Sequence, residues 1–228
     1  MIIGIIGRIG AGKDTVAQII QELQPEHNWQ IKKFAGKLKQ VASILTGIPV
    51  GDFEEQEVKE MHLGDEWGFL NSWAEFSESA PRVKMTVRNF LQKLGTDAIR
   101  DKLHPNAWVN ALMSDYVKCV PSKLMKDPSF QIKPRRMGMT NNTLDACFDF
   151  PNWLITDVRF PNEVEAITSR GGTVIRVDRM NNPYPKSNHI SETALDHLRL
   201  PTIINHGTID NLREVVKHAL KMIQNESN

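Results

Sequence analysis

The chain has 228 residues, of which 40% are hydrophobic and 24% are charged, so it is long enough to bury a substantial core as a globular protein. Its 28 lysine and arginine residues balance its 27 acidic residues, which excludes the strongly basic surface typical of proteins that bind nucleic acids or membranes. Two distant cysteines, Cys119 and Cys147, exclude a disulfide scaffold, and the apolar stretch 1–6 is too short for a signal sequence, so we expect a cytoplasmic protein.

The first predicted elements form a strand, a glycine-rich loop and a helix. Residues 2–6 are β-branched and do not alternate with polar residues, which predicts a strand buried on both faces. Glycines punctuate residues 7–15, and apolar residues then recur at helical spacing over 16–23, with Pro25 just beyond. This order is the opening of a βαβ unit.

The next stretch predicts a second strand at 30–34 and helices at 37–46, at 83–98 and beyond Pro105. The acidic, aromatic segment 52–79 has weak periodicity, and we expect it to belong to a mobile insertion on the substrate side. Residues 119–152 contain four prolines and predict a long irregular excursion, a kind of segment that is usually functional or disordered.

The last third of the chain returns to alternating strands and helices. Together with the first strands, these elements predict a doubly wound α/β fold with a five-stranded parallel sheet and helices on both faces, in which ligands bind at the carboxyl ends of the strands. The predicted strands are 153–158, 173–177 and 201–205, and the predicted helices are 163–170 and 209–223, the latter with an apolar stripe of Ile209, Leu212, Val216, Ala219, Leu220 and Ile223.

The strongest motif is G-x-x-x-x-G-K, which runs from Gly7 to Lys13 between a predicted strand and a predicted helix. Its glycines allow a tight turn that directs backbone N–H groups at phosphate oxygens, and the following helix N-terminus adds partial positive charge. Lys13 would bridge the β- and γ-phosphates of ATP. This context makes an ordinary strand-to-helix turn the weaker interpretation.

Three residues are candidates for holding Mg²⁺. Asp14 stands where this motif usually has serine or threonine, and Thr15 follows it, so either side chain would support the ion. Asp157 ends a predicted strand, as the Walker B acid of such proteins does, although a turn or helix cap is the alternative. Arg159 would lie on the same side of the extended chain as Asp157 and bind phosphates, or pair with Asp157 or Glu163.

Phosphoryl transfer also needs arginines that clamp two polyanions. The candidates are Arg88 and Arg100, expected near one face of the helix at 83–98 and its continuation, and Arg176 and Arg179 near the end of the fourth strand. For each of them a solvated surface charge is the alternative.

Five blocks resemble the deoxynucleoside monophosphate kinase family of bacteriophages: GRIGAGKDTVA at 7–17, FAGKLK at 34–39, RNFLQKLGTDAIR at 88–100, DVRFPNE at 157–163 and INHGT at 204–208. The resemblance implies an adenylate kinase-like fold with a core at about 1–36, 150–178 and 200–228, a substrate-binding insertion at about 37–149 and a lid at about 179–198. It implies Mg²⁺-dependent transfer of the ATP γ-phosphate to a dNMP, which gives dNDP and ADP, in the host cytoplasm if the protein is phage-encoded.

The resemblance also implies which residues form the site. The catalytic residues would be Lys13, Asp157, Arg159 and Arg179, of which Arg179 would come from the lid, and the metal ligands would be Asp14, Thr15 and Asp157. The residues that bind ATP would be Gly7, Ile9, Gly10, Ala11, Gly12, Lys13, Asp14, Thr15, Asn205, Gly207 and Thr208, with 205–208 near the adenine. The residues that bind the monophosphate substrate would be Phe34, Lys37, Arg88, Gln92, Asp97, Arg100 and Trp108.

Two other functions remain open. One is a P-loop kinase for another phosphorylated metabolite, of the phosphomevalonate or dephospho-coenzyme A type, and the other is a non-catalytic ATP-binding module. We expect the protein to bind small molecules and neither nucleic acid nor membranes. The sequence leaves open which bases the acceptor nucleotide carries, whether it is a ribonucleotide or a deoxyribonucleotide, and whether the protein is a homodimer. His189, Glu192 and His197 fit no standard metal spacing and favour a solvated lid.

Overall fold

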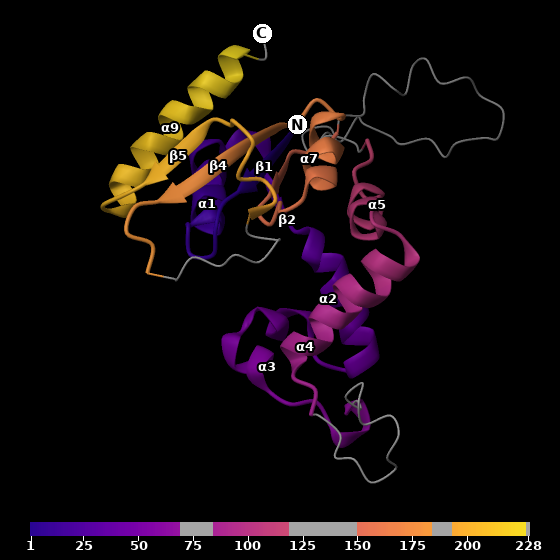
Figure 1. Ribbon diagram of the computed structural model, residues 1–228. Helices are drawn as coiled ribbons and strands as arrows, with labels where there is room; N and C mark the ends of the chain where they lie inside the picture. Colours follow the sequence, from indigo (N-terminus) through magenta and orange to yellow (C-terminus); the bar gives the residue numbers. More distant parts are fainter. Residues whose placement is uncertain (69–83, 119–149, 184–192, 227–228) are drawn as a thin grey trace, which may run out of the picture. The chain divides into compact units, whose positions relative to one another are not determined.

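The computed structural model describes residues 1–68, 84–118, 150–183 and 193–226 (Figure 1). The chain divides into two compact units. The core unit contains Met1–Lys33 and Leu112–Asn228, and the insertion unit contains Phe34–Ala111. The segments 69–83, 119–149 and 184–192 lie outside the described residues, and they include part of the predicted insertion, most of the predicted excursion and part of the predicted lid.

The core unit is built on a five-stranded, all-parallel sheet, as predicted. Its order is β2-β3-β1-β4-β5, so β1 lies in the centre, between β3 and β4. The carboxyl ends of all five strands therefore face the same edge of the sheet. The strands are β1 (Ile2–Ile6), β2 (Gln30–Lys32), β3 (Trp153–Ile155), β4 (Thr173–Arg179) and β5 (Thr202–Asn205).

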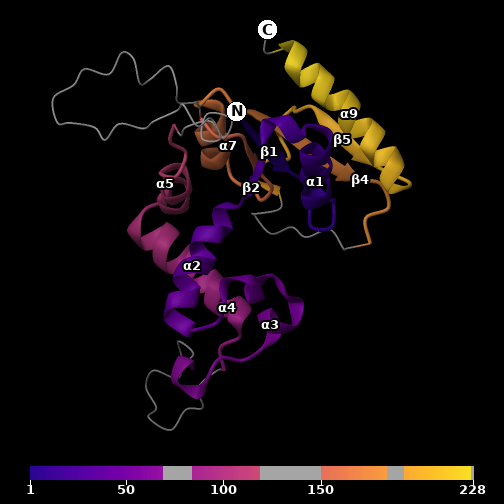
Figure 2. The same cartoon turned by 180° about the vertical axis from the view of Figure 1, so that it is seen from behind.

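Helices cover both faces of this sheet, which explains why β1 is apolar throughout. Ile3 and Ile5 belong to a core cluster with α1 (Lys13–Leu23) and α9 (Ile209–Glu226), which lie together in both views (Figures 1 and 2). The opposite face receives α7 (Pro161–Thr168). A Cβ at Gly4 would lie 2.7 Å from Ile167 Cδ1, so the missing side chain at this position allows α7 to approach closely.

The predicted helical stripes are largely confirmed. In α1, Val16, Ile19 and Ile20 are buried, and in α9 the buried residues recur from Leu212 to Ile223. Ile209 was wrongly included in the second stripe: it is the first residue of α9 and is 53% exposed, because it lies at the end of the helix. None of the helices in the described part of the chain has the length and apolar character needed to cross a bilayer.

Several predicted boundaries shift. β3 ends at Ile155, not 158, because Thr156 and Asp157 form a turn; the argument that Asp157 and Arg159 share one side of an extended strand is therefore wrong. β4 continues to Arg179 because it pairs with β5 as far as Asn205. β2 is shorter than predicted, and the following helix starts at Phe34.

The insertion unit is helical. Its core contains Phe53, Val87 and Phe90, and the Trp108 indole donates a hydrogen bond to the Gly95 carbonyl at 2.9 Å. Arg88 lies in α4, which continues into the π-helical segment η4. The rotation per residue differs between the two kinds of helix, so regular α-helical spacing does not tell whether Arg88 and Arg100 share a face. The elements are α2 (Phe34–Thr46), η2 (Val50–Glu54), α3 (Gln56–Glu60), η3 (Asp65–Trp67), α4 (Val87–Gln92), η4 (Lys93–Leu103) and the start of α5 (Ala107–Met113); η1 (Pro25–His27) belongs to the core unit.

Candidate active site

The glycine loop connects β1 to α1 at the carboxyl edge of the sheet. Gly7, Gly10 and Gly12 have φ values of 153°, 76° and 96°, which side chains disfavour. A Cβ at Gly7 would lie 2.3 Å from the Val177 carbonyl oxygen, and one at Gly12 would lie 2.6 Å from Asn205 Nδ2. The loop therefore packs directly against β4 and the end of β5, and glycine is required at both contacts.

Lys13 is the first residue of α1, and its side chain turns back over the loop. Its Nζ donates hydrogen bonds to the carbonyl oxygens of Gly7 at 2.7 Å and Arg8 at 3.1 Å. The ammonium group therefore lies on the loop that leads into α1, a helix whose first N–H groups have no partner within the helix. An ammonium group and a helix N-terminus at one place favour binding of a polyphosphate.

Side chains from neighbouring elements fix the outer part of the loop. Asn205 Nδ2 donates to the Ala11 carbonyl at 2.8 Å, Arg179 Nη1 to the Gly10 carbonyl at 3.2 Å, and Asn182 Nδ2 to the Ile9 carbonyl at 2.7 Å. Arg179 thus belongs to β4 and not to a lid, and its guanidinium binds the loop backbone. These three contacts hold the carbonyl groups of the loop in place.

The last two residues of the predicted adenine loop, Gly207 and Thr208, immediately precede α9. Gly207 has a φ of 75°, and Thr208 Oγ1 accepts a hydrogen bond from the Asn211 N–H at 3.3 Å. The Thr208 carbonyl also accepts from the Leu212 N–H. Both residues are exposed, so they define a surface where the loop, β5 and α9 meet.

Asp14 and Lys33 form an ion pair beside the loop, with 3.2 Å between Nζ and Oδ2. Partial burial would raise the pKa of the Asp14 carboxyl, but the nearby Thr156 hydroxyl and the charges of Lys33 and Lys13 outweigh it, so the pKa lies below its usual value. Asp14 is therefore an anion at neutral pH. The folding free energy that depends on the charged Asp14 carboxylate is fully present at pH values above the ordinary pKa of aspartate. It is lost only as the pH falls through the lowered pKa of the folded protein.

The residues next to Asp14 and in the turn after β3 include oxygen donors of the kind that Mg²⁺ prefers, and a magnesium site here stays a prediction. Thr156 Oγ1 is buried and has no full hydrogen bond within the described residues, and Asp157 follows it in the turn after β3. Across the described ranges, no three histidine, cysteine or acidic side chains gather as a metal site. Mg²⁺ prefers one or two carboxylates, several waters and phosphate oxygens, so Asp14, Asp157 and the Thr15 hydroxyl are a suitable donor set.

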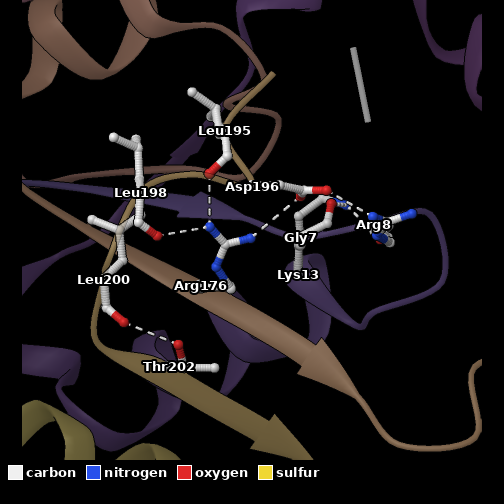
Figure 3. Close-up of polar contacts among 9 residues, drawn as sticks. All are labelled: Gly7, Arg8, Lys13, Arg176, Leu195, Asp196, Leu198, Leu200 and Thr202. Carbon is white, nitrogen blue, oxygen red and sulfur yellow. Dashed lines mark hydrogen bonds and ion pairs between the residues drawn. The ribbon is translucent and has the colours of Figure 1, made fainter. Parts of the chain in front are cut away.

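A recess at the same edge contains three arginines. Arg8, Arg159 and Arg176 line it together with Gly7 and Asp196. Figure 3 shows the Asp196 carboxylate between two guanidinium groups, at 2.8 Å from Arg8 Nη2 and 3.7 Å from Arg176 Nη1. Arg159 and Arg176 thus lie near Gly7 at the start of the loop, and their binding of phosphate stays a prediction.

The insertion unit contains the predicted substrate residues. Arg88 donates to Glu60 Oε1 from Nε at 3.0 Å and from Nη2 at 2.7 Å, and Gln56 donates to the same oxygen. Nearby, Lys59 donates to the Glu54 carbonyl at 2.7 Å. Burial lowers the pKa of Lys59, and the positive charges of Lys39 and Arg88 contribute to the same shift. Three cations therefore lie close together around α3, where Glu54 pairs with Lys39 and Glu60 pairs with Arg88.

A pocket of about 450 Å³ lies within the insertion unit. Trp67 and Phe90 form part of its wall and meet edge to face, with 5.0 Å between ring centroids. Asp97 and Lys93 supply charged groups to a lining that is otherwise completed by Met85, Leu94 and Ala98. Among the predicted substrate residues of the insertion, only Asp97 belongs to the lining of this pocket.

The other predicted substrate residues have different surroundings. Phe34 and Trp108 are buried at 3% and 8% exposure, so they support the fold of the insertion unit. Lys37 and Arg100 are partly exposed, and Gln92 is exposed. The structure brings these residues to one helical unit but not to one cavity.

Sequence patterns missed Arg8, Lys33, Trp67, Thr156 and Asp196. Arg8 occupies a variable position of the glycine motif, so its identity carries no signal by itself. Trp67 was noted only as part of an aromatic segment. Lys33 follows a strand at the carboxyl edge, and that position was the one clue available for it.

No family model matches the chain. The chain is 27% identical over 141 residues to the deoxynucleotide monophosphate kinase of Enterobacteria phage T4, a match that covers 60% of this chain and 46% of that protein. It is 46% identical over 61 residues to the uncharacterized protein ORF77 of Ictalurid herpesvirus 1 (strain Auburn), which covers 25% of this chain and 27% of that protein. The chain thus spans less than half the length of either relative, and it is distantly similar to a phage nucleotide kinase.

Proposed function

We propose that the protein is an ATP-dependent deoxynucleoside monophosphate kinase that converts a dNMP and ATP into a dNDP and ADP. The observation that carries this proposal is the glycine loop, with the Lys13 ammonium folded onto it and its carbonyl groups fixed by Arg179, Asn182 and Asn205. The distant similarity to the phage T4 kinase supports a nucleotide as the acceptor.

In this mechanism an anionic phosphate oxygen of the acceptor attacks the γ-phosphorus of ATP. The bond from that phosphorus to the β,γ-bridging oxygen breaks, and ADP leaves with the electron pair. Because the attacking oxygen is already ionised, the protein supplies charge neutralisation and alignment more than base catalysis. Lys13 and the N-terminus of α1 bind the triphosphate. Asp14, Thr15 and Asp157 would hold Mg²⁺, which draws negative charge from the phosphates.

We expect ADP formation from Mg-ATP to rise at least about tenfold when the accepted dNMP is added, because the second substrate completes the reaction. The measurement is a coupled ADP assay with dGMP, dTMP, dCMP and dAMP, each beside its ribonucleotide. Phosphomevalonate and dephospho-coenzyme A serve as alternative acceptors. Equal ADP release with and without every monophosphate would reject the proposal. A response to one of the other acceptors alone would identify a different kinase.

The pocket in the insertion unit suggests where the acceptor base binds. Its aromatic wall of Trp67 and Phe90 suits a planar ring, and Asp97 accepts hydrogen bonds. Guanine presents two adjacent N–H donors that a carboxylate binds as a pair, whereas the N–H of thymine lies between two carbonyl oxygens that repel a carboxylate. We therefore propose that Asp97 favours guanine.

Asp97→Asn should lower kcat/KM for dGMP about 10- to 100-fold, because hydrogen bonds to a charged group are lost, and should change kcat/KM for dTMP much less. Steady-state kinetics with both acceptors would measure this difference. Asp101→Asn is the matched control, since Asp101 is exposed on the same helical segment and does not line the pocket. An equal loss for the two acceptors would exclude base recognition by Asp97.

A further inference from the structure

Asp14 places a negative charge where the glycine motif usually has the neutral hydroxyl of serine or threonine. It is the second residue of α1, and the N-terminus of a helix carries a partial positive charge. A carboxylate in the first turn offsets part of that charge and repels the phosphate groups that the loop would bind. An aspartate at this position therefore lowers the affinity of the loop for a polyphosphate unless a cation lies beside it.

Lys33 places a positive charge beside this carboxylate. It directly follows β2 at the carboxyl edge of the sheet, and its Nζ donates a hydrogen bond to Asp14 Oδ2 at 3.2 Å. The Lys33 side chain is 29% exposed and the Asp14 side chain is 59% exposed. The lysine is thus the more buried partner, and it leaves much of the Asp14 side chain open to solvent.

The effect of this pair is on the charge of the loop more than on the folding free energy. Ion pairs with such exposure contribute little to stability. Together, however, Asp14 and Lys33 carry no net charge, as is true of the hydroxyl group that the motif usually has. Lys13 is a second cation whose charge reaches Asp14, and its Nζ lies on the Gly7 and Arg8 carbonyl oxygens. With Lys33 in place, the charge of Lys13 is not needed to offset Asp14.

We propose that Lys33 compensates the charge of Asp14 and thereby allows the glycine loop of this chain to bind a nucleotide polyphosphate, so that the two residues together replace the neutral hydroxyl of the usual motif. This inference rests on the proposed function for the identity of the ligand. Lys33 acts through Asp14 and is a positioning residue for charge, so it need not touch the nucleotide.

The test is the affinity of the full chain for ADP, measured by calorimetry in EDTA, because a metal ion at Asp14 would itself supply positive charge. Lys33→Gln should weaken ADP binding about fivefold at low ionic strength, since the Asp14 charge then repels the phosphates. Asp14→Ser should tighten binding for the opposite reason. The double variant Asp14→Ser/Lys33→Gln has the same net charge as the wild type, and its affinity should return to within about twofold of the wild-type value.

A matched control and the salt dependence separate this role from a structural one. Lys32→Gln removes the same charge one residue earlier, where the ammonium group lies over the Trp153 ring, and should change ADP affinity less than about twofold. The loss in Lys33→Gln should shrink at about 0.5 M salt, because salt screens the repulsion from Asp14. Urea unfolding would establish that each variant is folded.

Three results would overturn the role of Lys33: wild-type affinity in Lys33→Gln, an undiminished loss in the double variant, or a loss that does not change with salt. Each of them would leave the kinase proposal standing, because the wild type would still bind ADP. A failed acceptor panel would reject the kinase and leave the charge compensation intact, since these measurements involve no acceptor and no turnover. Absence of ADP binding by the wild type would overturn both.

Discussion

Lys13→Ala should reduce the rate of phosphoryl transfer about 100- to 1,000-fold, the loss expected when one preorganised cation is removed from a developing phosphoryl charge. The structure gives the physical reason: Nζ lies on the loop between the Gly7 and Arg8 carbonyl oxygens, where a γ-phosphate would meet it. The dissociation constant of ADP should change far less than kcat, because the ammonium group acts chiefly on the outer phosphates.

Single-turnover ADP formation at saturating ATP and acceptor measures this effect. Lys217→Ala is the matched control: it is the same substitution in the same unit, but Lys217 is half exposed on α9 and forms a local pair with Glu214. Lys13→Ala should also stay folded, since Lys13 is partly exposed and its Nζ donates to two backbone carbonyls of a loop. A variant that retains a third of the wild-type rate would remove Lys13 from the mechanism.

Local patterns were sufficient to predict the architecture. Burial explains the apolar run Ile2–Ile6 and the spacing of apolar residues in α1 and α9. Backbone freedom explains the glycine motif. Those requirements led to the parallel sheet with helices on both faces. Boundaries were less predictable, because the length of β4 depends on its pairing with β5 and not on its own residues.

The site was only partly predictable for a related reason. The contacts that orient it join residues far apart in the sequence, as in the pairs Arg8–Asp196, Lys33–Asp14 and Asn205–Ala11. A sequence pattern shows which residue types are present, but it does not show which carboxylate will reach which guanidinium. Arg179 illustrates the difference: the family resemblance implied that it comes from a lid, whereas strand pairing places it in β4 and a hydrogen bond joins it to the glycine loop.

The packing of that loop leads to the second large effect, a loss of folding free energy in Gly7→Ala. A Cβ at Gly7 would lie 2.3 Å from the Val177 carbonyl oxygen, a backbone atom of β4 that cannot move without disturbing the sheet. The φ value of 153° is also strained for alanine. Backbone strain and steric overlap each cost about 1–3 kcal/mol, so Gly7→Ala should destabilise the protein by about 3–5 kcal/mol.

Gly171→Ala separates these two contributions. Gly171 has a φ of 71°, but a Cβ there would have no neighbour within 4 Å, so alanine meets backbone strain without overlap and should cost about 1–2 kcal/mol. Urea unfolding of both variants and the wild type would give the free energies. The excess loss in Gly7→Ala measures how tightly β4 holds the loop. Equal losses in the two variants would mean that the loop moves away from Val177 at little cost, and the loop geometry inferred for phosphate binding would then not be fixed by the sheet.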